Sequence, residues 1–392
     1  MKALAKPFAQ PGTKPLKERV ATLGVFLANG FGIGAWAVEV PRIKESLSLS
    51  DTSLGIALFA FALGAIVAMP LAGQLVPRFG SGRLTALLGA AFVVALPLPA
   101  FAPNLATLCI VLLALGAANG ALDVLMNGHA SAIETQWKSP IMSSFHASWS
   151  AGGLLGAATG GMLQKGGVGV IGGLVLPDLF IAGLILAAAV LALRDLGPRA
   201  AASSSGFALP NAGVMKLALL AFLCLLVEGS VADWSAVYLR SALNEEASVA
   251  AVGYSAFAFS MAACRFVGDG FVRRFGSGKV VGLGGLLATA GLALVLGLPT
   301  VFTAFAGFAM VGVGLANIVP VIFSAAGRSS VTPAIGVSMA ATAGYAGFLV
   351  GPPLIGFGAG LLGLRVALCV LVVATLIVCL LGGKAVRRAS VG

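Results

Sequence analysis

The sequence contains few charged residues. Only 9% of its 392 residues are Asp, Glu, Lys or Arg, and 59% are hydrophobic, whereas an average soluble domain carries about 25% charged residues. A chain this apolar cannot cover itself with polar surface, so lipid has to be its main solvent. The composition excludes a soluble globular protein and predicts an integral membrane protein.

Signatures of common enzymes and metal sites are also missing. The sequence has no Walker loop, no GxSxG and no HExxH. Two histidines and five isolated cysteines do not make a common zinc site, and the cysteines are expected to be small buried hydrophobes. We therefore predict no catalytic residues, no metal and no cofactor, and no ATP-driven pumping by this chain.

The net charge of +11 does not indicate nucleic acid as a partner. No basic stripe or basic helix stands free of the apolar segments, as a nucleic-acid-binding surface would require. Most basic residues lie in short loops between apolar runs, where they determine the orientation of a protein in the membrane.

Twelve apolar runs are long enough to cross a membrane, since a transmembrane helix needs about 20 apolar residues. The predicted spans of the first half are residues 20–40, 51–75, 84–102, 105–128, 142–163 and 174–193. Those of the second half are residues 214–239, 249–272, 279–298, 301–325, 335–360 and 364–383. Residues 1–19 contain no apolar stretch typical of a cleavable signal peptide, so we expect the first run to remain as the first helix.

Lys and Arg residues are distributed unequally between the two sides of these spans. With a cytoplasmic N-terminus, 18 of the 24 lie in inner segments, 5 lie in outer segments and Arg265 lies within a span. Because Lys and Arg favour the cytoplasmic side, both termini are predicted to be inside, in a bacterial inner membrane.

An internal repeat divides the chain in half. Residues 76–83, Val-Pro-Arg-Phe-Gly-Ser-Gly-Arg, recur as residues 272–279, Val-Arg-Arg-Phe-Gly-Ser-Gly-Lys, at an offset of 196 residues. Residues 200–213 between the halves are rich in Ser, Ala, Gly and Pro and read as a cytoplasmic linker. Parallel six-helix repeats of this kind are a known transporter plan, with the substrate held at their interface near the middle of the membrane.

With this repeat, the chain resembles the major facilitator superfamily of transporters over essentially its whole length. The loop Gly73-x-Leu75-x-x-Arg78-x-Gly80-x-x-Arg83 is similar to the signature that the family carries between helices two and three. The resemblance implies an all-α membrane protein with twelve transmembrane helices in two pseudo-symmetric six-helix bundles. The bundles would be residues 1–199 and 214–392.

The same resemblance suggests which residues control the gates. It implies gating roles for Arg78 and Arg83 and, in the second copy, for Arg274. The aspartate usual in this loop is replaced by Pro77, so the family's charge relay is not intact here. Arg265 and Asp269, four residues apart near the inner end of the eighth span, are expected to form an ion pair that steadies the inner gate.

Ionisable and amide side chains inside the spans are the candidates for function, because each one costs energy in lipid. In the fourth span, Asn119, Asp123 and Asn127 follow at i, i+4 and i+8 and share one helix face. The stripe fits a solute or proton site, and the alternative is a structural polar network. The segment around Asp123 resembles the fourth helix of the fucose permease branch, where an acidic residue takes part in proton-coupled sugar uptake.

The fifth and seventh spans add further candidates for proton coupling. His146 shares a face with Trp149, and a carboxylate such as Asp123 with an imidazole makes a proton relay, although a lone histidine is more often structural. Glu228 lies at the middle of the seventh span, beside a Gly-Ser pair that weakens the helix. Such interruptions often line binding sites.

Hydroxyls, amides and aromatic faces suit a polyhydroxylated ligand. The remaining predicted substrate-binding residues are of these kinds, and alone each is a weak indication: Asn29, Trp36, Trp149, Asn317, Thr342 and Tyr345.

These features predict a monomeric secondary transporter embedded in the lipid bilayer. Its expected partners are a small sugar-like solute and protons, and the simplest mechanism is symport of the two. A glycine run from Gly152 to Gly161 resembles the family's antiporter motif and keeps open an exporter of drugs or metabolites, although close helix packing also explains it. A transporter-like sensor that moves nothing would be expected to carry long soluble tails, and none is present.

Overall fold

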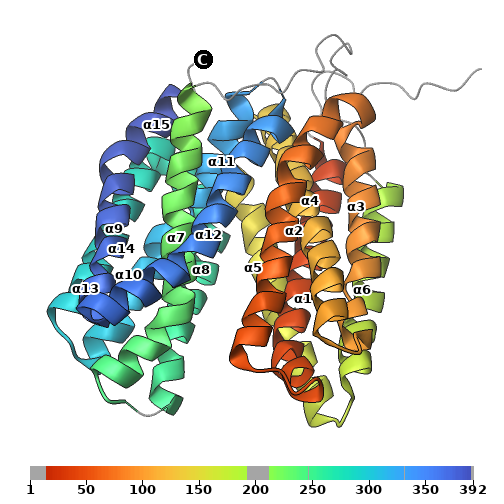
Figure 1. Ribbon diagram of the computed structural model, residues 1–392. Helices are drawn as coiled ribbons and strands as arrows, with labels where there is room; N and C mark the ends of the chain where they lie inside the picture. Colours follow the sequence, from red (N-terminus) through yellow and green to blue (C-terminus); the bar gives the residue numbers. More distant parts are fainter. Residues whose placement is uncertain (1–14, 192–211, 246, 331, 390–392) are drawn as a thin grey trace, which may run out of the picture.

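The computed structural model describes residues 15–191, 212–245, 247–330 and 332–389, which fold almost entirely into helices (Figure 1). The first half contains α1 (Leu16–Ser46), α2 (Asp51–Phe79), α3 (Ser81–Ala95) with the short η1 (Leu98–Phe101), α4 (Leu105–Trp137), α5 (Met142–Lys165) and α6 (Val170–Leu191). The second half begins with α7 (Ala212–Ala242), α8 (Ala247–Phe275) and α9 (Ser277–Gly297). It continues with α10 (Val301–Leu315), α11 (Ile318–Arg328), α12 (Pro333–Leu362), α13 (Leu364–Ala367), α14 (Cys369–Ile377), η2 (Val378–Gly382) and α15 (Gly383–Arg388).

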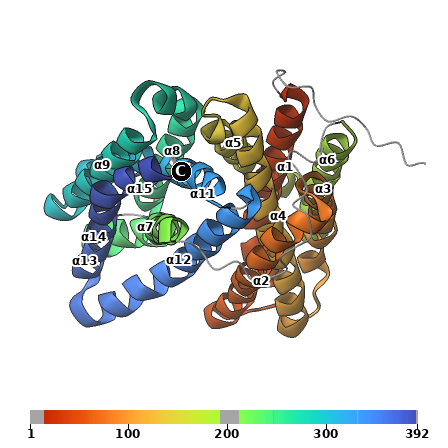
Figure 2. The ribbon, with the colours of Figure 1, turned by 90° about the horizontal axis from the view of Figure 1, so that it is seen from above.

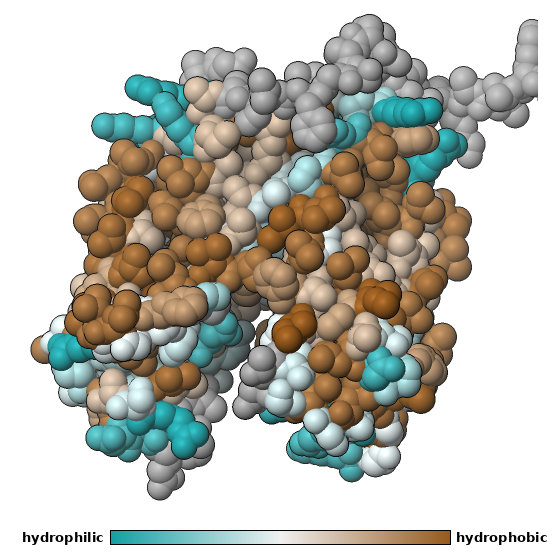
Figure 3. Space-filling view, viewed as in Figure 1, coloured by the Kyte–Doolittle hydropathy of each residue, from teal (hydrophilic) through white to brown (hydrophobic). Residues whose placement is uncertain are grey.

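These helices form two bundles that stand side by side, one from α1–α6 and one from α7–α15 (Figures 1 and 2). Ten of the described helical segments are long and apolar enough to cross a membrane. A brown, hydrophobic band crosses the face seen in Figure 3, and teal, hydrophilic residues lie towards both ends of the molecule. The predicted twelve-helix membrane fold is confirmed. Most of the predicted linker 200–213 lies outside the described residues.

The sequence repeat is repeated in the backbone. Gly80 precedes α3 with φ 85° and ψ 146°, and Gly276 precedes α9 with φ 81° and ψ 150°. Both residues lie at positive φ, where a side chain would be strained and glycine is favoured. The two halves therefore turn from their second to their third membrane helix in the same way.

The tenth membrane helix is interrupted, although the sequence predicted one run over 301–325. It consists of α10 and α11, which are separated at Ala316 and Asn317. Every residue from Ile318 to Gly327 is buried, whereas its counterpart in the first half, α4, is one continuous helix. The interruption places a short, fully packed helix between the two bundles.

Glycines let the helices within each bundle approach closely. A Cβ on Gly152 of α5 would lie 2.2 Å from the Leu27 carbonyl oxygen of α1, and a Cβ on Gly347 of α12 would lie 2.2 Å from the Phe222 carbonyl oxygen of α7. No side chain fits at such distances. Close packing therefore accounts for these glycines in both halves.

The two bundles touch at one end of the molecule and part at the other. We call the closed end the termini end, because the chain reaches its last described helix there (top of Figure 1). At this end the Ser338 hydroxyl of α12 donates to the Met69 carbonyl of α2 at 2.8 Å. At the opposite end a cleft separates the halves (Figure 3).

Candidate functional site

The polar stripe of α4 forms the first part of the site. The Asn127 side-chain nitrogen donates to the Asp123 carboxylate at 3.2 Å and to the Asp123 carbonyl at 2.9 Å. This arrangement uses the donor of Asn127 and leaves its buried Oδ1 without a hydrogen-bond partner. Asp123 and Asn127 therefore present mainly acceptor atoms.

A chain of amides continues from α4 through α1 to α5. The Trp149 indole N–H donates to Asn29 Oδ1 at 2.9 Å, and Asn29 Nδ2 donates to Asn119 Oδ1 at 2.8 Å. Asn29 and Asn119 are only 2% and 4% exposed, so their hydrogen bonds are protected from competition by water. Three of the predicted substrate-binding residues are thus held in a fixed arrangement by one another.

Tyr345 brings the second half to this chain. Its side chain interacts with that of Asn119, and its hydroxyl lies within electrostatic reach of Asp123 and Glu228. Tyr345 lies 196 residues after Trp149, the repeat offset. The fifth membrane helix of each half therefore contributes one aromatic residue with a polar tip to the same polar chain.

Glu228 of α7 faces Arg265 of α8, and their charged atoms are 3.9 Å apart. Arg265 also donates to the Ser150 hydroxyl of α5 at 2.9 Å and to the Ala316 carbonyl at 3.3 Å, at the interruption between α10 and α11. A helix break in a membrane leaves backbone carbonyls that need such a donor. Arg265 thus connects both halves and the broken helix.

The predicted ion pair between Arg265 and Asp269 is wrong. Asp269 instead accepts hydrogen bonds from the backbone N–H groups of Ser143 at 2.8 Å and Ser144 at 3.1 Å, across the interface between the halves. These N–H groups begin α5, which has no side-chain cap of its own. A carboxylate at a helix N-terminus satisfies its free donors and its dipole, and this arrangement outcompetes the i,i+4 pair.

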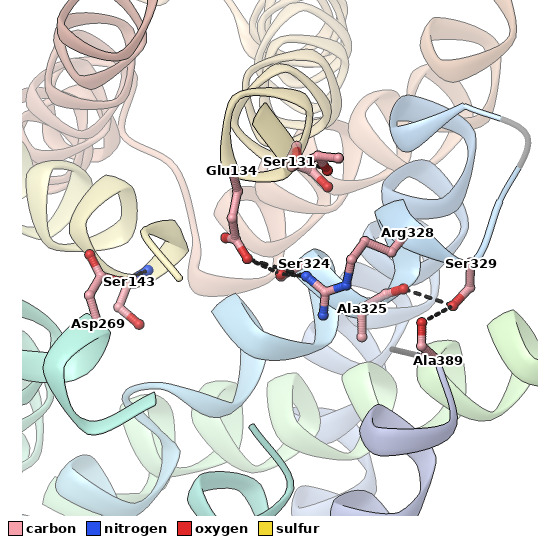
Figure 4. Close-up of polar contacts among 10 residues, drawn as sticks. Ser131, Glu134, Ser143, Asp269, Ser324, Ala325, Arg328, Ser329 and Ala389 are labelled. Atoms are coloured by element: carbon pink, nitrogen blue, oxygen red, sulfur yellow. Dashed lines mark hydrogen bonds and ion pairs between the residues drawn. The ribbon is translucent and has the colours of Figure 1, made fainter. Parts of the chain in front are cut away.

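Another contact between the halves, at the termini end, was missed by the sequence analysis (Figure 4). The Ser324 hydroxyl of α11 donates to Glu134 of α4, and Arg328 donates to Glu134 at 3.2 Å and also to Ser324. Glu134 is 8% exposed. The signal was available, because Glu134 is an acidic residue only seven positions after Asn127 on the same helix.

Two other predicted residues, His146 and Asn317, lie outside the polar chain. His146 packs between the rings of Phe26 and Phe323, with centroids 5.7 and 5.9 Å away, and its Nε2 has no hydrogen-bond partner. No hydrogen bond joins the described side chains of His146 and Asp123, so the predicted relay is not assembled in this conformation. Asn317 lies at the break between α10 and α11, and its side-chain nitrogen donates to the Cys264 carbonyl of α8 at 3.3 Å.

The remaining predicted positions divide between core and surface. Trp36 is 7% exposed and belongs to the hydrophobic core of the first bundle, so the structure does not bring it to the polar chain. Thr342 has a buried hydroxyl without a hydrogen-bond partner. Arg78 and Arg274 lie over the rings of Phe79 and Phe275 next to the repeated loops, and Arg83 is exposed.

Comparisons with known proteins agree with this geometry. The family model of the Major Facilitator Superfamily matches residues 22–330. An uncharacterized MFS-type transporter of Yersinia pestis is 37% identical over 359 residues, covering 91% of this chain and 92% of the relative. Membrane protein MosC of Rhizobium meliloti is 35% identical over 377 residues, covering 95% and 92%.

Solved structures show the same fold at low sequence identity. The transporter FucP in its outward conformation matches with a TM-score of 0.77 at 16% identity, over 95% of this chain and 98% of that one. The proton:xylose symporter XylE matches with a TM-score of 0.76 at 12% identity, over 95% and 96%. The family match, the close relatives and the paired six-helix bundles show that this chain belongs to the Major Facilitator Superfamily of transporters.

Proposed function

We propose that the protein is a proton-coupled symporter that moves a small, sugar-like solute by alternating access. The observation that carries the proposal is the polar chain from Trp149 through Asn29 and Asn119 to Tyr345, which crosses the interface beside Asp123. Amide, hydroxyl and indole groups supply the donors and acceptors that a polyol requires. Two structural neighbours are a fucose:proton symporter and a proton:xylose symporter, which supports the substrate class.

Asp123 is the proposed coupling residue. It is the carboxylate of the α4 stripe and has Asn127 as its side-chain partner. A proton on Asp123 removes a charge from the interface and lowers the free energy of bringing the halves together around it. Glu228 is the second candidate, because Arg265 keeps a counter-charge beside it, and His146 is the third.

The orientation follows from the Lys and Arg distribution. The inner segments of the sequence map to the termini end, so this end is proposed to be cytoplasmic and the cleft to open outwards, in a bacterial inner membrane. The alternative, an antiporter that exports drugs or metabolites, rested on the glycine run of α5. Packing of α5 against α1 accounts for Gly152 and Gly156, where a Cβ would lie 2.2 and 2.0 Å from carbonyl oxygens of α1.

The test is transport by the purified protein in liposomes. A thermal-shift screen of sugars, sugar acids, amino acids and drugs first identifies a bound solute. Uptake is then measured with and without an inward proton gradient. We expect accumulation only with the gradient, and we expect Asp123→Asn to abolish accumulation while solute exchange continues. Unchanged accumulation by this variant would exclude Asp123 as the coupling site.

A further inference from the structure

Asn127 has an unusual balance of hydrogen bonds for a buried residue of a membrane helix. It is 0% exposed. Its side-chain nitrogen donates to the Asp123 carbonyl at 2.9 Å and to Asp123 Oδ1 at 3.2 Å, whereas its own Oδ1 is buried without a partner. A buried acceptor without a donor costs free energy, and asparagine is also a poor helix former. Among the described contacts, only the donation to Asp123 offsets these two costs.

A leucine at this position would avoid both costs. It has nearly the shape of asparagine, is a better helix former and carries no polar atom that needs a partner. Residues 124–131 of α4 are all buried, so packing alone favours an apolar side chain at position 127. Positions where a sequence departs from such a local rule are often functional. The effect of the amide on Asp123, and not packing, therefore accounts for Asn127.

The two carboxylate oxygens of Asp123 have different surroundings. Oδ1 accepts the hydrogen bond from Asn127, and no described residue donates to Oδ2. Asp123 is also the only residue from Ala118 to Ser131 that is not buried. Because the buried Asn127 holds Oδ1, the other oxygen, Oδ2, remains free to take up a proton.

The helix itself fixes the donor in place. Asn127 Nδ2 also donates to the backbone carbonyl of Asp123, one turn earlier on α4, and amide–carboxylate pairs at i, i+4 are favourable in helices. This second hydrogen bond holds the amide in the same orientation whether Asp123 is ionised or protonated. A donor that is in place before the charge appears needs no reorganisation. It stabilises the carboxylate as soon as the proton leaves.

We propose that Asn127 is the positioning residue of the coupling site: it holds Asp123 Oδ1 and so assigns proton uptake and release to Asp123 Oδ2. This inference rests on the proposed function, in which Asp123 carries the coupling proton. Asn127 does not receive the proton and acts only through the Asp123 carboxyl group. Without the N–H donor, the carboxylate loses its one described hydrogen bond, and the protein behaves more like the uncharged Asp123→Asn variant.

The surroundings of Asp123 offer no other strong partner among the described residues. Asp123 forms no ion pair there, and Tyr345 of α12 is the titratable group that lies within electrostatic reach of it from the other half. The charged and titratable residues of α1, α2, α3, α5 and α11, which pack against α4, lie within about two turns of a helix end. On α4 itself, His129 is bonded to Ser81 and Glu134 to Ser324. Asn127 is therefore the residue whose removal changes the Asp123 carboxyl group most directly.

The first arm of the test observes this carboxyl group and needs no solute. Infrared difference spectra between acidic and alkaline pH are recorded on the purified full-length protein, and the band that disappears in Asp123→Asn is the carbonyl stretch of protonated Asp123. With the proton on Oδ2, Oδ1 is the carbonyl oxygen, and the hydrogen bond from Asn127 lowers its stretching frequency. We expect Asn127→Leu to shift this band to higher wavenumber. An unshifted band in this variant would overturn the proposal.

The second arm uses a matched pair of longer side chains. Gln and Met have the same length, and only Gln has an amide. In liposomes, with a solute identified by the thermal-shift screen, we measure the ratio of gradient-driven uptake to solute exchange. It is expected to fall about tenfold in Asn127→Met, because a hydrogen bond to a charged group contributes at least this factor, and to recover in Asn127→Gln. A packing defect alone would affect both variants alike, so equal ratios would overturn the proposal.

The inference and the proposed function can fail separately. If no carboxyl band disappears in Asp123→Asn, Asp123 does not titrate, and both its coupling role and the positioning role of Asn127 are excluded. If the band disappears in Asp123→Asn but is insensitive to Asn127→Leu, Asp123 remains the coupling residue and only the role of Asn127 is excluded. A proportional loss of uptake and exchange in Asn127→Met would make Asn127 a ligand of the solute instead and would also overturn the inference.

Discussion

Glu134 forms hydrogen bonds with residues of the other half of the molecule. It lies on α4, whereas Ser324 and Arg328 lie on α11 in the other half. Two hydrogen bonds from one half therefore end on a single carboxylate of the other. Breaking a buried pair by removing one partner leaves the remaining charge uncompensated, which is more damaging than removing both.

The contact can be tested by a double-mutant cycle. Arg328→Met leaves the Glu134 carboxylate without its counter-charge and is expected to destabilise the closed termini end by about 1–3 kcal/mol. Glu134→Gln in the same chain removes that charge, so the double variant is expected to be more stable than Arg328→Met alone. Thermal midpoints of the three variants measure the coupling. Strictly additive changes would show that the pair does not hold the halves together.

Helix α5 is fixed at its start by another helix. Its first N–H groups have no cap from their own chain segment, and Asp269 of α8 supplies both acceptors from the opposite bundle. Any opening of the termini end by movement of the two halves, as the proposed function requires, would separate α8 from α5. The start of α5 is therefore capped only while this end is closed, which couples the stability of one helix end to the conformation of the transporter.

Removing this cap should affect the conformation as well as the helix. Asp269→Ala is expected to cost about 1 kcal/mol, as for other helix caps, and to increase hydrogen exchange at Ser143 and Ser144. The control is Asn104→Ala, which removes the cap that Thr107 uses at the start of α4 within one half. Only Asp269→Ala should increase the accessibility of the termini end to thiol reagents. Equal accessibility in both variants would show that Asp269 acts only as a helix cap and does not hold the termini end closed.

At the scale of the whole molecule, the sequence predicted what depends on composition and repetition. The spans and the two halves follow from hydropathy and from the constant offset of the sequence repeat. The pairing of Arg265 did not follow, because i,i+4 spacing describes one helix and its actual partners come from α7, α5 and a broken helix. The burial of Trp36 was missed for the same reason, since hydropathy does not tell which neighbour a helix face meets.

The closed termini end predicts that movement of the halves can be stopped without harming either of them. A Cβ on Gly327 of α11 would lie 2.9 Å from the Ser131 Cβ of α4, so cysteines at both positions in a cysteine-free background are expected to form a disulfide across the halves. Oxidation should abolish transport, and a reductant should restore it. Solute that enters through the open cleft should still bind the oxidised protein and stabilise it against thermal unfolding. The matched control joins Thr289 and Thr375, whose hydroxyls are 3.0 Å apart within the second half. Because rigid halves move relative to each other and not internally, this control should transport normally when oxidised. Transport by the oxidised 131–327 pair would mean that the termini end need not open.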